Sequence, residues 1–284
     1  MSLENLILQF NAEFAAASRC YSQRQALRLK QSQVEGMFQG LCLNSTFARI
    51  VDMSGGLLGQ QALLQAYSPN QRPLSSWAPY AVACFDEKAI VYLDRLCRTL
   101  HTLNWLAQGS EGLLFLDVHP RHIQEVRRNH GKVFEAILRR CSLQPQQIVL
   151  RLSETDSLEP DHLVRSLECF RARGFAIALV QHGDDHSQFT SLLDLGPDFV
   201  QIERPPQPLA EGELAARLVS WALLAHQHNS RVLVHGIDNQ ASAEIAWLAG
   251  VDGIQGDYAE QLAAGAVALD GDEERHHLLT TVRR

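Results

Sequence analysis

The sequence contains no run of about 18 consecutive apolar residues, which is the minimum for a candidate transmembrane helix. Its first residues also lack the basic-then-apolar pattern of a secretory signal. Six cysteines are scattered without a CxxC pair: Cys20, Cys42, Cys84, Cys97, Cys141 and Cys169. We therefore expect reduced thiols, no membrane span and a cytoplasmic location.

Several catalytic and nucleotide-binding motifs are also missing. The chain has no GxSxG elbow, no GxxxxGK[ST] loop and no GxGxxG after a strand, so these routes to hydrolysis or nucleotide binding are unsupported. The net charge of -7, from 25 basic and 32 acidic residues, disfavours a direct nucleic-acid partner. One local basic run, predicted to be a solvated helix face, comprises Arg121, His122, Arg127, Arg128, His130 and Lys132.

The apolar content of 46% and the charged content of 20% are ordinary for a soluble folded protein. Near the N-terminus, helical spacing of apolar residues predicts a helix, and a second helix is predicted to follow it. We expect residues 1–45 to form a helical extension that packs on its own domain. The first helix carries Leu3, Leu6, Ile7, Phe10 and Phe14, and the second carries Ala26, Leu27, Leu29 and Val34.

From about residue 46, short apolar runs alternate with longer helical stretches at intervals of about 20 to 35 residues, as in a parallel sheet with crossover helices. A TIM-like (βα)8 barrel is predicted over residues 46–268, followed by a polar tail over 269–284. The runs at 47–52 and 57–64 flank Met53-Ser54-Gly55-Gly56 and predict a hairpin with an antiparallel first strand. The later strands are expected at 113–118, 147–152, 175–180, 198–202, 231–235 and 252–255.

The carboxyl ends of barrel strands converge on one mouth, where barrel enzymes carry their chemistry. Asp117, Glu203 and Asp238 are acidic there, but Arg151 adds a positive charge, and hydrolysis of a phosphodiester usually needs hard cations held by several oxygens. Arg151 can serve as counter-ion to Asp117, pair with Glu154, or bind a ligand phosphate through its fork of donors.

One loop is dense in groups that can bind a transition metal, with a His-x-Asp-Asp-His spacing. A turn or interaction loop is favoured over a metal site there, because short polar loops with glycine are usually turns. The loop residues are His182, Asp184, Asp185 and His186, and the other histidines predicted to lie on the surface are His119, His122, His276 and His277.

Several segments resemble the EAL-domain family, whose members hydrolyse cyclic di-GMP with metal ions on a modified TIM barrel with one antiparallel strand. The similarity covers about residues 46 to 262. Its most specific parts are GFAIALVQHG at 174–183 and LGPDFVQIER at 195–204. Similar motifs are GQQALL at 59–64, LDVHP at 116–120, LRLSET at 150–155, VHGIDN at 234–239 and IQG at 254–256.

The resemblance also marks where this chain departs from the family. Gln61 stands at the glutamate of the EAL triplet, and Asp117 stands at an asparagine. Arg151 replaces a glutamate, and Val180 and Gln181 replace paired aspartates. The loss of these negative charges and the gain of an arginine predict that Mg²⁺ is rejected, so no cofactor is expected.

Further departures concern ligand binding. Gln201 stands at a lysine, His235 at a glutamate, and Asp238 at a second glutamate, whereas Gln255 is unchanged. Gln65 replaces the arginine that contacts the dinucleotide in the family. The candidate ligand contacts implied by the resemblance are Arg151, Gln255 and Gln65.

The resemblance implies a degenerate, inactive phosphodiesterase domain that acts on a regulatory protein partner. Two alternatives stay open. One is a cyclic di-GMP receptor that binds without hydrolysis, and the other is a residual phosphodiesterase with His235 as a base. Relatives often pair through the segment after the paired aspartates, here residues 183–189, so a homodimer is a further alternative.

Overall fold

The computed structural model describes residues 2–17, 25–52, 54–183, 185–203 and 211–265. Cys20, Met53, Asp184, His276, His277 and the predicted tail at 269–284 lie outside the described residues. The helices that position the site or pack around it are α1 (Leu3–Ala17), α2 (Ala78–Ala83), α3 (Glu87–Ala107), α4 (Pro120–Glu125), α5 (Lys132–Arg140), α6 (Pro160–Arg171), α7 (His186–Asp194), α8 (Glu211–Gln227), α9 (Gln240–Leu248) and α10 (Asp257–Ala263).

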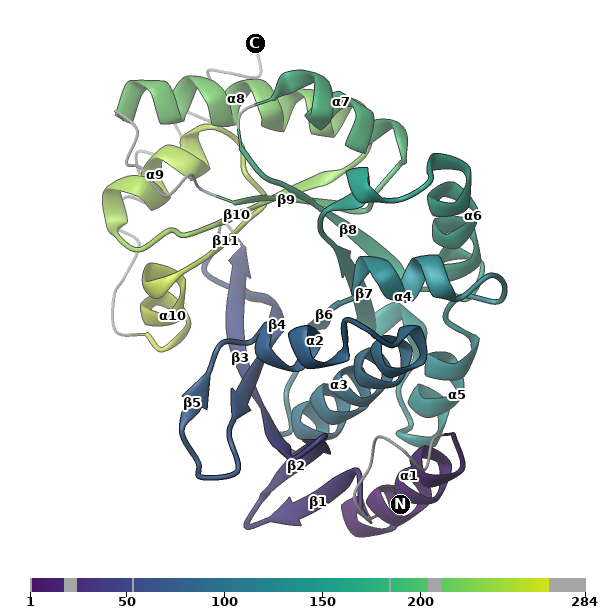
Figure 1. Cartoon of the computed structure of the whole chain (residues 1–284). Helices are drawn as coiled ribbons and strands as arrows, with labels where there is room; N and C mark the ends of the chain where they lie inside the picture. Colours follow the sequence, from purple (N-terminus) through teal and green to yellow (C-terminus); the bar gives the residue numbers. More distant parts are fainter. Residues whose placement is uncertain (1, 18–24, 53, 184, 204–210, 266–284) are drawn as a thin grey trace.

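Eight strands close a barrel in the order β3-β11-β10-β9-β8-β7-β6-β4, with β4 pairing back to β3 (Figure 1). Strand β3 runs antiparallel to both neighbours, and the other neighbours are parallel. The predicted barrel with one antiparallel strand is confirmed. Its strands are β3 (Leu41–Asp52), β4 (Leu57–Tyr67), β6 (Leu113–Asp117), β7 (Ile148–Leu152), β8 (Ala176–Gln181), β9 (Phe199–Glu203), β10 (Arg231–His235) and β11 (Gly253–Gln255).

The barrel interior is filled by one buried side chain from each of several strands, since alternate residues of a strand face inward. The inward cluster contains Ile50, Phe115, Val149, Ala178, Phe199 and Leu233. The rings of Phe115 and Phe199 meet edge to face at 5.3 Å. This apolar layer forms the floor beneath the polar mouth.

The N-terminal segment departs from the prediction in one respect. Helix α1 is confirmed, but the predicted second helix is wrong, because β1 (Leu27–Lys30) and β2 (Gln33–Phe38) form an antiparallel hairpin. Strand β2 continues the sheet onto the start of β3. Asn104 of α3 fixes this hairpin through two hydrogen bonds of 2.8 Å with the backbone of Val34.

Helix α1 packs against the barrel domain, as its apolar stripe predicts. Leu6, Ile7, Phe10 and Phe14 are buried in the cluster that also contains α3 and the outer faces of several strands. The Arg140 guanidinium lies over the Phe10 ring at 4.6 Å. Strand β3 runs without a break through residue 45, and the division of the chain into 1–45 and 46–268 stays a prediction.

Candidate ligand site at the barrel mouth

The strand register places charged residues side by side at the carboxyl ends of the parallel strands. Asp117 of β6 is paired in register with Arg151 of β7, and Glu203 of β9 with His235 of β10. Asp117 lies two residues beyond the inward-facing Phe115, so it belongs to the same face of its strand. The mouth therefore presents an ordered row of acid, base, acid and base.

Arg151 is the centre of this row, and its side chain is only 11% exposed. Its Nη1 donates to Asp117 Oδ1 at 2.7 Å, its Nη2 to Glu203 Oε1 at 2.6 Å, and its Nε to Gln201 Oε1 at 2.8 Å. The predicted ion pair between Arg151 and Asp117 is thus present. One guanidinium bridges carboxylates from two strands that are not adjacent.

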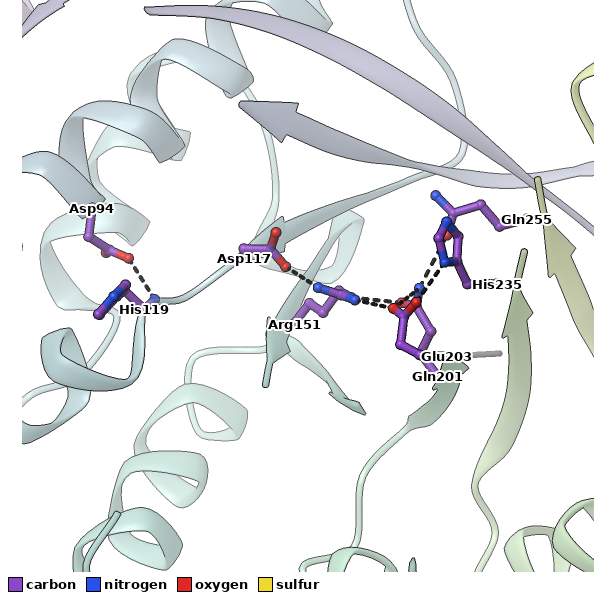
Figure 2. Close-up of polar contacts among 8 residues, drawn as sticks. All are labelled: Asp94, Asp117, His119, Arg151, Gln201, Glu203, His235 and Gln255. Atoms are coloured by element: carbon purple, nitrogen blue, oxygen red, sulfur yellow. Dashed lines mark hydrogen bonds and ion pairs between the residues drawn. The ribbon is translucent and has the colours of Figure 1, made fainter. Parts of the chain in front are cut away.

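A second set of contacts extends the row across the mouth (Figure 2). His235 Nδ1 lies 2.6 Å from Glu203 Oε2, and Gln201 Nε2 donates to Gln255 Oε1 at 3.2 Å. Glu203 therefore accepts from Arg151 with one oxygen and faces the imidazole with the other. Six side chains from five strands form one connected polar chain that begins at Asp117 and Arg151.

The contacts set the charge states of this chain of residues. Burial disfavours the charge on Arg151, but Asp117 and Glu203 outweigh it and raise the pKa of the guanidinium. Burial likewise opposes ionisation of Glu203, yet His235 and Arg151 hold the pKa of this carboxyl below its usual range. The hydrogen bond to Glu203 raises the pKa of His235 against the effect of burial. The mouth thus favours paired, ionised groups.

The other predicted site residues surround this network or lie apart from it. Val180 and Gln61 are buried, whereas Gln65 is exposed and accepts from the Tyr67 hydroxyl at 3.1 Å. Gln181 is fully buried and donates to Gln188 of α7 at 3.2 Å. Asp238 is exposed, and its Oδ1 accepts from the backbone N–H of residue 257 at the start of α10.

A cavity of about 450 Å³ opens beside the mouth, between the end of β4, α2 and the loop after β6. Arg151 and Asp117 lie at its wall, together with Trp77, Tyr80 and His119. The rings of Tyr80 and His119 stack at 4.7 Å with an interplanar angle of 18°. Planar aromatic walls next to charged groups suit a ligand with both a flat ring and polar substituents.

The prediction that His122 lies on the surface is wrong, and so is a solvated helix face for the two histidines of the basic run, His122 and His130. His122 and His130 are 4% and 2% exposed, and His119 is half-buried, with its backbone N–H donating to Asp94 Oδ1 at 2.9 Å (Figure 2). His122 Nδ1 lies 3.1 Å from Asp94 Oδ2. Burial lowers the pKa of His122 to about 3, which leaves the ring neutral.

The polar loop that contains His182 and Asp185 leads into α7, whose first residue is His186. The Asp185 carboxylate caps the helix by accepting from the backbone N–H groups of Ser187 and Gln188, and the His186 ring meets Trp221 edge to face at 5.9 Å. Within the part of the chain that the structure describes, no group of three or more His, Cys, Asp or Glu side chains is placed to hold a metal ion. The described cysteines are free thiols.

Two features of the site escaped sequence reasoning. Glu203 stood among the acids of the mouth, but its role as the bridge between Arg151 and His235 depends on the register of three strands. The aromatic residues Trp77 and Tyr80 at the cavity come from the N-cap and first turn of α2, a short helix before α3 that carries no motif. The first requires knowledge of which strands are neighbours, and the second of where α2 packs against the barrel.

Fold and site together define a (βα)-barrel protein with a polar network and a cavity of about 450 Å³ at the carboxyl ends of the strands. The chain belongs to the EAL domain family, whose model matches residues 38–261. No curated protein matches the chain. Among the described residues, no helix is long and apolar enough to cross a membrane.

Solved structures of EAL proteins share this fold. The Bacillus subtilis YkuI protein, solved with cyclic di-GMP and calcium, is 20% identical with a TM-score of 0.63, and the alignment covers 85% of this chain but 60% of that one. The EAL domain of Xanthomonas citri FimX with cyclic di-GMP is 16% identical with a TM-score of 0.62, covering 90% and 92%. A standalone Vibrio cholerae EAL protein bound to cyclic di-GMP is 18% identical with a TM-score of 0.59, covering 76% and 90%.

Proposed function

We propose that the chain is a non-catalytic regulatory protein of the EAL family that acts through contacts with a protein partner. The observation that carries this proposal is the position of the Arg151 guanidinium, which takes up oxygens of Asp117 and Glu203 at the centre of the mouth. Oxygens that accept from a guanidinium are not free to hold the metal ions with which hydrolytic members of the family work.

The donor set at the mouth does not fit a hard divalent cation. Mg²⁺ prefers several free carboxylate or water oxygens in octahedral geometry, and here Arg151 donates to Asp117 and Glu203 while His235 occupies the second oxygen of Glu203. Two unit positive charges 4 Å apart repel by about 4 kcal/mol at a dielectric constant of about 20, and a divalent ion doubles that repulsion. A metal would have to displace the guanidinium first.

Three exposed apolar side chains, on α2 and just before and after it, support the proposed protein contact. Phe85 is 97% exposed, Trp77 57% and Val82 47%. Soluble monomers rarely expose large apolar side chains in contiguous groups, and such groups often mark interaction sites. Because Trp77 also lines the cavity, a partner bound there would lie next to the mouth.

The proposal is tested by capturing partners from host extract with the wild-type chain and with Phe85→Asp. A protein that is retained by the wild type and lost with Phe85→Asp supports a contact through α2. Leu248→Asp on α9, where Leu248 is 73% exposed, is the matched control and should retain that protein. Capture that is identical for all three baits would contradict the proposal.

The cavity favours one second candidate, a receptor that binds cyclic di-GMP without hydrolysing it. Its aromatic wall of Tyr80 and His119 offers a stacking surface, and the guanidinium of Arg151 lies at the same cavity. The YkuI and FimX structures were solved with this dinucleotide. Calorimetric titration with cyclic di-GMP separates the candidates: micromolar binding that Trp77→Ala and Arg151→Ala both weaken supports a receptor, and the absence of heat supports the partner-binding function alone.

A further inference from the structure

A second, smaller cavity lies outside the barrel, between α3, α4 and the start of α5. Its volume is about 20 Å³, enough for a single water molecule or one oxygen of a larger group. Arg95, Arg98 and Asn129 line it, together with the first residues of α5. None of these residues belongs to the mouth or to the 450 Å³ cavity.

Arg98 is a buried cation with unused hydrogen-bonding capacity. Its side chain is 3% exposed, and its Nη2 pairs with Asp94. Its Nε is buried and has no hydrogen-bond partner. A buried guanidinium N–H without an acceptor costs free energy comparable to a lost hydrogen bond, so the geometry calls for an acceptor that the protein does not itself supply.

Arg95 adds a second positive charge one turn earlier on α3. Burial and the neighbouring Arg98 both lower its pKa, and no described carboxylate lies within ion-pair distance of its guanidinium. His122 is neutral because of its own low pKa. The single carboxylate of Asp94 pairs with Arg98, which leaves the positive charge of Arg95 uncompensated at the cavity.

Helix α5 directs its N-terminus at the same cavity. Its N-cap is Gly131, which provides no side-chain hydrogen bond to the first turn, and Val133 and Phe134 line the cavity. The Lys132 N–H donates to the Asn129 carbonyl, but the N–H groups of Val133 and Phe134 and the positive end of the helix dipole favour an anion there. The one acidic residue of this first turn, Glu135, is already paired with Arg173 at 2.6 Å.

The surrounding chain is basic on both sides of the cavity. Arg127 and Arg128 lie between its lining residues Val126 and Asn129, and Lys132 is the first residue of α5. Glu125 is the acid on this stretch, and its pKa is raised by burial and by the nearby Glu87. This is the basic run that the sequence displays and that the barrel mouth does not use.

We propose that this cavity, named the α3–α5 pocket, is a binding site for a phosphate group, with Arg95, Arg98 and the N–H groups of Val133 and Phe134 as donors. Because the cavity admits about one oxygen, the group enters with one oxygen and leaves the rest at the opening. Inorganic phosphate and the terminal phosphate of an ester share this chemistry. The site is independent of the function proposed for the mouth.

The test measures melting temperature and calorimetric heat with inorganic phosphate against sodium chloride of equal ionic strength. Wild-type protein should gain about 2 °C or more at saturating phosphate, and Arg95→Ala should weaken binding by about tenfold or more. Arg139→Ala is the matched control, since this arginine of α5 has a 78% exposed side chain away from the pocket. It should bind like wild type.

Phenyl phosphate forms the second arm. Binding of both compounds with the same loss in Arg95→Ala identifies a terminal phosphate ester as an acceptable ligand, and binding of inorganic phosphate alone identifies the free ion. An equal response in wild type, Arg95→Ala and Arg139→Ala would overturn the proposal, as would no response at all. A response lost in Arg151→Ala but kept in Arg95→Ala would place the phosphate at the mouth and refute the α3–α5 pocket.

Discussion

Arg151→Met removes the central cation of the mouth and should destabilise the fold strongly. The substitution deletes hydrogen bonds to Asp117, Glu203 and Gln201 from a guanidinium that is 11% exposed. Removing one partner of a buried ion pair costs about 3–5 kcal/mol because the other charge stays desolvated. The Asp117 side chain is 52% exposed and regains water, so we expect a loss of about 3 kcal/mol.

Urea unfolding at pH 7, followed by circular dichroism, measures this loss. Arg139→Met, which breaks an exposed pair with Glu135, is the control and should cost less than about 1 kcal/mol. Adding Glu203→Gln to Arg151→Met should recover part of the loss, because it removes the carboxylate left without its cation. A cost below about 1 kcal/mol for Arg151→Met, or no recovery in the double variant, would refute the account of an internal counter-ion.

Three further predictions concern pH, the hairpin and the N-terminal helix. The raised pKa of His235 means that its pairing with Glu203 stabilises the fold below about pH 6.5 and is lost as pH rises through the folded-state pKa. His235→Gln should therefore cost more stability in urea at pH 6 than at pH 9, and equal costs would contradict the pairing. Asn104→Leu should lower the free energy of unfolding by about 3 kcal/mol, since it leaves the buried backbone groups of Val34 unpaired. A loss under about 1 kcal/mol would show that the fold does not depend on these two hydrogen bonds. Phe10→Ala should cost about 3–5 kcal/mol within a single calorimetric transition, and a separate transition would show that α1 does not share the core.

Most of the barrel could be predicted from the sequence, because buried parallel strands appear as short apolar runs. The expected strands at 113–118 and 231–235 correspond to β6 (Leu113–Asp117) and β10 (Arg231–His235). The sequence predicts a helix where β1 and β2 form a hairpin, and the difference has a physical reason. The turn of this hairpin at Gln31 takes a positive φ of 57° without the glycine or asparagine that usually marks such a turn.

The sequence predicts which residues lie at the site better than it predicts which of them contact one another. Arg151 and Asp117 are neighbours because β6 and β7 are adjacent, which the strand order of a barrel implies. The basic run does not predict the burial of His122, because its partner Asp94 lies on α3, far along the chain from this histidine. A local pattern of charges does not reveal a carboxylate that is distant in sequence and is placed next to the histidine only by tertiary packing.

The most direct test of whether Arg151 closes this EAL mouth to catalysis is incubation of the purified chain with cyclic di-GMP and Mg²⁺ or Mn²⁺, with chromatographic detection of the linear dinucleotide. With the Arg151 guanidinium bound to Asp117 and Glu203, no linear product should form with either metal. Metal-dependent formation of the linear dinucleotide, abolished by Glu203→Gln, would contradict it and make the chain a phosphodiesterase.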